Sequence, residues 1–185
     1  MPTITVLVSA ICVVLSSSVA LAQSSGSARA PLGSVIDLWV TKTEQIVVPA
    51  ADALPERSYD FRPTAGEFAR VRSFAEQVSH LAAANYQLAA RVLGEEPPAG
   101  TMNETAPASV KTKAQVMEYL RASFQSLHRA ASGITVQNAE DPIVTGKEMQ
   151  SGVGLMIDAL AHAQNHYGQI VEYLRMNHIV PPASR

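Results

Sequence analysis

Cysteine is almost absent from this chain of 185 residues, since Cys12 is the only one. It lies inside an apolar run from Ile4 to Ala22 near the N-terminus. If that run is removed, no thiol remains, which excludes disulfides, thiolate metal ligands and a cysteine nucleophile.

Lys and Arg number only 14 against 16 Asp and Glu, and they are scattered rather than clustered. Without a basic stripe for phosphate groups, the composition excludes nucleic acid as an expected partner.

The N-terminal segment lacks charged side chains as far as Arg29. Its apolar run ends in Ala20-Leu21-Ala22, the small-x-small pattern of a signal-peptidase site, and a polar Ser/Gly segment follows. We therefore predict a signal peptide at 1–22, a flexible linker at 23–30, and a periplasmic or secreted protein with no stable membrane anchor after cleavage. The alternative is an uncleaved membrane anchor, which three consecutive serines within the run disfavour.

The remaining residues, 31–185, form one predicted domain, because a chain of this length needs only a single core. Apolar side chains recur at helical spacing in four segments, at about 32–54, 73–93, 112–132 and 145–177. Pro49 predicts a kink or a local restart within the first segment.

Local sequence signals mark where the later helices begin. Capping boxes open the second and third helices, with Ser73 before Glu76 and Thr112 before Gln115. The stretch 134–144 contains turn residues and only weak alternation, so it is predicted to be a loop. With four amphipathic helices and no convincing strand, the predicted fold class is all-α, a four-helix bundle.

Two histidines, His162 and His166, are spaced by four residues in the last predicted helix. Positions i and i+4 lie on the same face of a helix, so both imidazoles can reach one ion. His80 lies on the apolar face of the second predicted helix and is the best candidate for a third ligand. His128 is expected at the edge of a buried face as a structural residue, and His178 at the end of the last helix.

Three neutral imidazoles leave a divalent ion with an open coordination position, which is typical of catalytic rather than closed zinc sites. Such an ion polarises a substrate or lowers the pKa of bound water to roughly 7. Imidazole suits zinc, nickel, iron and manganese, so the metal identity stays open. A chance His pair, or a hydrogen-bonded core histidine, is the alternative interpretation. A haem bundle is disfavoured because there is no Cys-x-x-Cys-His motif.

Several motifs appear together in a fixed order: Tyr59-Asp60-Phe61-Arg62-Pro63, Ser73 to Leu81 with His80, His162-x-x-x-His166-Tyr167-Gly168-Gln169, and a tail ending in Pro181-Pro182. In these features the chain resembles the DinB/YfiT-like group of metalloenzymes from about residue 34 to residue 182. The resemblance implies an up-down-down-up bundle, with the three metal ligands at His80, His162 and His166.

Members of that group include thiol transferases that use bacillithiol and isomerases that depend on mycothiol, and many have no known reaction. An exported protein would not readily meet a cytosolic thiol. We therefore expect a metal-dependent transferase or hydrolase acting on an unidentified small molecule. The alternative is a non-catalytic metal-binding or stress-associated bundle. Whether the chain works as a homodimer is left open.

Overall fold

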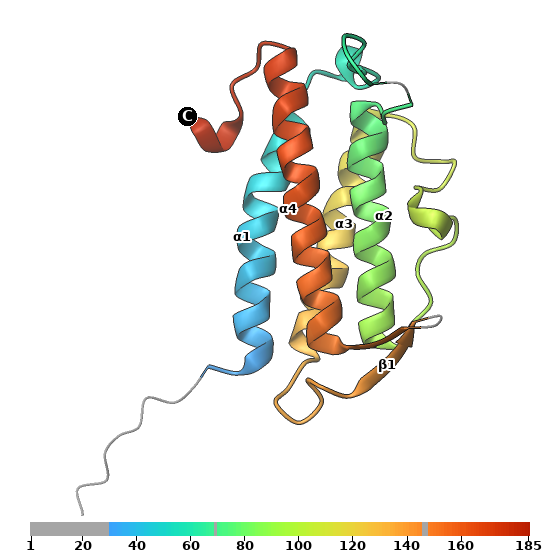
Figure 1. Cartoon of the computed structure of the whole chain (residues 1–185), viewed down its shortest axis with the longest axis vertical. Helices are drawn as coiled ribbons and strands as arrows, with labels where there is room; N and C mark the ends of the chain where they lie inside the picture. The colour runs from blue at the N-terminus through green and yellow to red at the C-terminus, as the bar shows by residue number, and fades with distance from the viewer. Residues whose placement is uncertain (1–29, 69, 146–147) are drawn as a thin grey trace, which may run out of the picture.

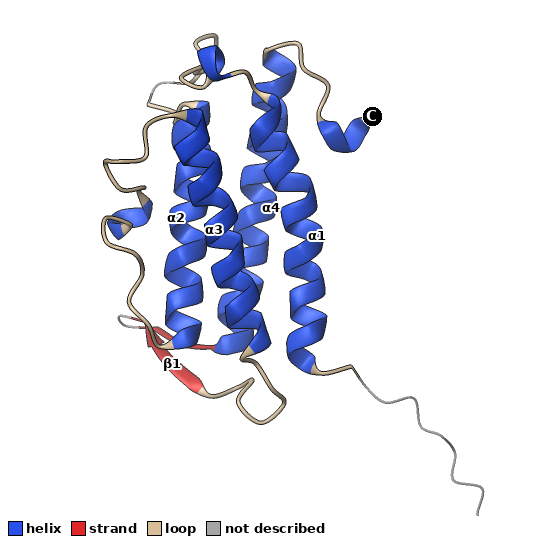
Figure 2. Ribbon diagram, turned by 180° about the vertical axis from the view of Figure 1, so that it is seen from behind, coloured by secondary structure: helices blue, strands red, loops and turns tan. Residues whose placement is uncertain are grey.

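The computed structural model describes residues 30–68, 70–145 and 148–185, and four long helices stand side by side in it (Figures 1 and 2). They are α1 (Leu32–Ala53), α2 (Phe74–Leu93), α3 (Lys113–Ser132) and α4 (Gly152–Met176). This arrangement confirms the predicted all-α bundle. The predicted signal peptide, and all of the linker except its last residue, lie outside the described residues.

Helices α1 and α4 run in one direction and α2 and α3 in the other, which is the up-down-down-up order (Figure 1). Helices α1 and α2 each pack against both α3 and α4. Because α2 and α3 are parallel, the segment between them, residues 94–112, must return along the length of the bundle (Figure 1). A short 3-10 helix, η2 (Met102–Glu104), lies on this returning segment beside α2.

The starts of α2 and α3 follow the predicted capping boxes. The Ser73 hydroxyl accepts a hydrogen bond from the backbone N–H of Glu76, and the Glu76 carboxylate accepts one from the N–H of Ser73. Thr112 and Gln115 form the same reciprocal pair at the start of α3. Such a box satisfies backbone donors that the first helical turn would otherwise leave unpaired. The start of α2 is thereby fixed two turns before His80.

Pro49 does not interrupt the first helix, which continues through it to Ala53. Its ring is exposed, so the lost backbone hydrogen bond lies on the solvent side of the bundle. The expected restart at this position is therefore wrong. Two further 3-10 turns, η1 (Glu56–Ser58) and η3 (Pro182–Ser184), follow the ends of α1 and α4.

The segment before α4 differs from the prediction. A loop and an early helix start near Thr145 were expected, but strands β1 (Pro142–Thr145) and β2 (Glu148–Ser151) pair there as an antiparallel hairpin at one end of the bundle (Figure 2). Helix α4 begins later, where the Ser151 hydroxyl accepts a hydrogen bond from the N–H of Gly154. Thr145 was expected to cap the helix because Glu148 follows it three residues later, the spacing of a capping box. The competing strand pairing decides the boundary.

The core lies between the four helices and contains mainly Leu, Val and Ala, with Phe74 and Phe124 as its largest fully buried side chains. Many alanines on α2, including Ala82 and Ala83, are fully buried, so neighbouring helices approach closely there. Among the described helices, none is both long and apolar enough to cross a membrane.

Candidate metal centre

Three histidines from two helices converge inside the bundle: His80 on α2, and His162 and His166 one turn apart on α4. One ring nitrogen of each lies within 4.8 Å of the corresponding nitrogens of the other two. The ring centroids are 5.2 Å apart for His80 and His162, 4.7 Å for His80 and His166, and 4.3 Å for His162 and His166. The structure therefore brings together the three residues expected from helical spacing, in positions suited to hold a metal ion.

The backbone of η2 orients the imidazole of His80. Its Nδ1 lies 3.0 Å from the carbonyl oxygen of Glu104, and since a carbonyl only accepts, Nδ1 carries the proton and donates it. The lone pair is then on Nε2, the other ring nitrogen. Both Asn103 and Glu104 have positive φ angles, 57° and 54°, so an uncommon backbone turn presents this carbonyl to the ring.

Side-chain amides orient His166. Nε2 of Gln77 lies 2.7 Å from Nδ1 of His166, and Gln77 is almost fully buried. An amide nitrogen only donates, so Nδ1 accepts and the proton of His166 is on Nε2. That Nε2 lies 2.9 Å from Nε2 of His162 and can donate to it. The proton of His162 is then on Nδ1, a buried atom without a hydrogen-bond partner among the described residues.

Burial and the neighbouring imidazoles keep the two rings of α4, His162 and His166, neutral. Burial lowers the pKa of His162, and the neighbouring His80 lowers it further. Burial, followed by the charges of His162 and His80, lowers the pKa of His166 to about 3. The neutral imidazole is the form that ligates metals. Two of the three candidate ligands are thus uncharged at neutral pH.

The donor set fits a divalent ion. Three ring nitrogens from two helices lie within 4.8 Å of one another, one ring is oriented by a backbone carbonyl, and Nδ1 of His162 is a buried polar atom without a hydrogen-bond partner among the described residues. Outer groups of this kind are common around metal-bound histidines because they fix the tautomer and the ring orientation. Three imidazoles suit zinc, nickel, iron or manganese alike. Within the described residues no further His, Cys, Asp or Glu joins the cluster.

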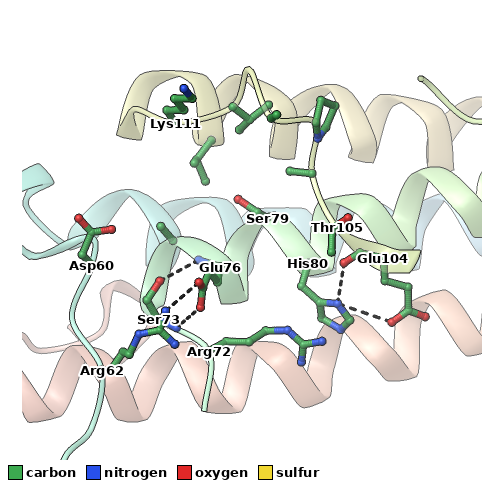
Figure 3. A pocket seen from close by; sticks show the side chains of 16 residues that line it. Asp60, Arg62, Arg72, Ser73, Glu76, Ser79, His80, Glu104, Thr105 and Lys111 are labelled. Atoms are coloured by element: carbon green, nitrogen blue, oxygen red, sulfur yellow. Dashed lines mark hydrogen bonds and ion pairs between the residues drawn. The ribbon is translucent and has the colours of Figure 1, made fainter. Parts of the chain in front are cut away.

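Two cavities flank the cluster. The larger, of about 550 Å³, lies between α2 and the segment 104–111, and its lining includes His80, Arg72 and Glu104 (Figure 3). A smaller one, of about 120 Å³, is lined in part by His162, Asp158 and Glu104. Glu104 borders both, with its carboxylate 3.5 Å from Nδ1 of His80. A small molecule in the larger cavity would therefore meet His80 and a carboxylate.

The other two histidines lie away from the cluster. His128 on α3 is half-buried and bonds to Asp37 and Glu44 of α1, which agrees with the structural role expected for it. His178 lies just past α4 with a φ of 59°, in the left-handed region where glycine is usual. His178 is exposed. Neither is placed to join the three ligands.

Two polar residues of α2, Asn85 and Tyr86, have partners away from the metal centre. Asn85 donates to the hydroxyl of Ser123 in the core, and Tyr86 packs against Tyr119. Gln169 does reach the site, because its carbonyl oxygen accepts from the amide of Gln77. Sequence reasoning missed Gln77 itself, although its position three residues before His80 places it on the same side of α2.

Glu104 and Arg72 were also missed. Both lie outside regular α-helix, where no periodic signal relates a residue to the site. Only the fold shows that the segment returning along the bundle brings Glu104 to His80, and that Arg72 faces the same cavity.

A family model for the DinB superfamily matches residues 40–170, a range that contains all three histidines. The chain belongs to the DinB superfamily. No curated protein matches it.

Proposed function

We propose that this protein is an exported, metal-dependent transferase or hydrolase acting on a small molecule, with His80, His162 and His166 as the ligands of its divalent ion. The observation that carries this proposal is the convergence of three ring nitrogens within 4.8 Å. Three protein ligands leave at least one coordination position for a substrate atom. A bound ion would supply Lewis acidity, polarising a carbonyl or phosphoryl group or activating a nucleophile.

The protein's own groups have separate tasks in this proposal. The bundle excludes bulk water from two of the three imidazoles, since His80 and His166 are only 5% and 6% exposed. Glu104 is the acid–base group, because it borders both cavities and its carboxylate lies 3.5 Å from Nδ1 of His80. From this position it can take a proton from a molecule bound in the larger cavity. The larger cavity holds the substrate, and its volume of about 550 Å³ is within the range of small-molecule sites.

The first experiment asks whether the ion is accessible. The protein is loaded with cobalt and titrated with azide while its visible absorption spectrum is recorded. An open site gives a new spectrum as azide becomes a ligand. A spectrum that azide leaves unchanged indicates a closed coordination sphere and favours the alternative, a non-catalytic metal-binding bundle.

The same titration tests Glu104. Its negative charge disfavours an anion beside His80, so Glu104→Gln should bind azide several-fold more tightly than the wild type. Asp158→Asn is the matched control, because Asp158 borders only the smaller of these two cavities. Equal azide affinity in Glu104→Gln and the wild type contradicts a position for this carboxylate beside the open ligand site.

Export is supported by the apolar run and the Ala20-Leu21-Ala22 motif. N-terminal sequencing of protein recovered from the periplasm or medium of the native host should begin at Gln23. Retention of residues 1–22 in that protein contradicts signal cleavage.

A further inference from the structure

Arg72 differs from the neighbouring arginine of the same cavity. The Arg62 guanidinium donates to the Glu76 carboxylate at 2.7 Å and to the carbonyl of Val71 at 2.6 Å. Within the described part of the chain, the Arg72 guanidinium forms no hydrogen bond or ion pair. In Figure 3 it extends along the cavity toward His80, whereas Arg62 turns to Glu76. Among the described residues, the cavity beside the metal centre therefore contains a guanidinium that is not bonded to any carboxylate, and the nearby Glu76 carboxylate is bonded to Arg62 instead.

The position of Arg72 is fixed although its head group is free. Its backbone carbonyl accepts a hydrogen bond of 2.8 Å from the hydroxyl of Tyr173 on α4. The next residue, Ser73, is the cap that starts α2. A fixed backbone and an unpaired guanidinium are what an anion-binding arginine needs.

We infer that the substrate carries an anionic oxygen group, and that Arg72 binds this group while the reacting end lies at the metal. A guanidinium donates two parallel hydrogen bonds to a carboxylate or a phosphate, which orients the bound molecule as well as attracting it. Arg72 and His80 line the same cavity, so a single small molecule can span both. This inference rests on the proposed open metal site.

Paired thiols test the contact on cobalt-loaded protein. Mercaptopropionate and mercaptopropanol bind the ion through the same thiol, but only the first carries a carboxylate. Longer pairs of the same kind increase the distance between the thiol and the carboxylate. The wild type should bind at least one carboxylate member about tenfold more tightly than its alcohol. Arg72→Gln should abolish this preference, and Arg72→Lys should restore part of it. Arg175→Gln, at an exposed arginine of α4 paired with Glu172, should leave it unchanged.

The outcomes separate the two proposals. If Arg72→Gln keeps the full preference, or the wild type has none for any pair, the anion contact is wrong while the metal site stands. If no thiol changes the cobalt spectrum of the wild type, the open site fails and the Arg72 inference fails with it.

A second inference concerns a chain of three side-chain amides behind His166. Nε2 of Gln77 donates both to Nδ1 of His166, at 2.7 Å, and to Oε1 of Gln169, at 2.5 Å. Nε2 of Gln169 in turn donates to Oδ1 of Asn165 at 2.6 Å. Asn165 is exposed, so the chain ends in solvent. These contacts fix the proton of His166 on Nε2, the nitrogen nearest His162.

Ligation requires the opposite arrangement. For Nε2 of His166 to bind an ion, its proton must lie on Nδ1, which must then donate. We propose that Gln77 is a positioning residue. When the site binds a metal ion, its carboxamide flips so that Oε1 and Nε2 exchange places, and Oε1 then accepts a hydrogen bond from Nδ1 of His166. Gln169 and Asn165 turn with it, so that every hydrogen bond of the chain is kept with donor and acceptor exchanged.

Nitrogen NMR of the imidazoles tests this arrangement before any metal is added. In metal-free wild type, Nδ1 of His166 should be unprotonated. In metal-free Gln77→Glu a carboxylate faces Nδ1, so Nδ1 should carry a proton. Gln164→Glu is the control, since Gln164 lies on α4, the helix of His166, but bonds to Thr43. An unprotonated Nδ1 in Gln77→Glu overturns the proposal.

Zinc affinity gives the second measurement. Gln77→Met offers no acceptor to Nδ1 and should bind zinc about 10- to 100-fold more weakly than the wild type. Gln164→Met should bind it as the wild type does. Unchanged affinity in Gln77→Met overturns a positioning role for Gln77, whereas an absence of zinc binding in the wild type overturns the metal site as well.

Discussion

Histidine occurs in two contrasting environments in this bundle. Three imidazoles cluster between α2 and α4, whereas His128 lies alone between α3 and α1. Around His162 and His166, burial and other imidazoles lower the pKa, so the rings are neutral and can ligate. Burial also lowers the pKa of His128, but its hydrogen bonds and ion pairs with Asp37 and Glu44 outweigh that effect and raise it. In the cluster, and among the described residues, a carboxylate approaches one ring only, that of His80, where Glu104 lies 3.5 Å from Nδ1. The other environment, that of His128, joins two helices through charge.

The difference shows why neighbours must be known before a histidine is interpreted. His128 donates from both ring nitrogens to carboxylates, at 2.5 Å to Asp37 and 3.1 Å to Glu44, so neither nitrogen is available to an ion. A protonated ring in that position stabilises the packing of α3 on α1. The three clustered rings have at most one nitrogen each bonded to a group outside the cluster, which leaves the second for an ion.

The largest expected effect is on metal content. His162→Ala with His166→Ala removes two of three ligands, so zinc in the purified protein should fall from about one ion per chain to background. His80→Ala should also reduce it sharply. His128→Ala should keep the full content, because its carboxylate partners exclude it from ligation. Elemental analysis measures this, and undiminished zinc in the double variant contradicts the assigned site.

The second expected effect is on stability. Zinc at about 100 times its dissociation constant adds about 2.7 kcal/mol to the free energy of unfolding, because only the folded state brings the ligands together. For a domain of this size that corresponds to a rise of about 5 to 11 °C in Tm. Thermal unfolding with and without zinc measures it. The rise should vanish in His80→Ala and persist in His128→Ala, and equal shifts in both would contradict the division of roles.

These expectations could be derived from sequence only in part. Helical spacing sufficed for His162 and His166, because positions i and i+4 share a face whatever the rest of the fold does. His80 could be added because its apolar neighbours point it to the core. The capping boxes at Ser73 and Thr112 fixed two helix starts, since each depends on residues three positions apart.

Features that depend on contacts between distant segments could not be derived in this way. Glu104 reaches His80 only because the connection between parallel helices must return along the bundle. The partners of His128 lie 91 and 84 residues away in sequence, with no pattern that links them. The hairpin before α4 was missed for a related reason, since strand pairing there overrides a local helix signal at Thr145.

The third effect is the pH dependence of the α1–α3 contact. The folded-state pKa of His128 is raised above its unfolded value, so its contribution is fully present below about pH 6.5 and is lost as pH rises through the folded pKa. His128→Gln should therefore lower the free energy of unfolding by about 1 to 2 kcal/mol near pH 6 and by less near pH 9. Urea unfolding of metal-free protein at the two pH values checks this. A cost that is the same at both would mean that packing, not charge, stabilises the contact.

The smallest effect distinguishes the two carboxylates that hold His128. Asp37 contacts Nδ1 at 2.5 Å and contributes more to the raised pKa than Glu44, which contacts Nε2 at 3.1 Å. Asp37→Asn should therefore lower the pKa of His128 further than Glu44→Gln, because it removes the closer charge and the stronger charge-assisted hydrogen bond. Proton NMR titration of the His128 ring measures both shifts. The zinc affinity of both variants should equal that of the wild type, since neither carboxylate touches the three clustered histidines. A reversed order of the two shifts would show that the longer contact dominates, and a change in zinc affinity would show that the two regions are not independent.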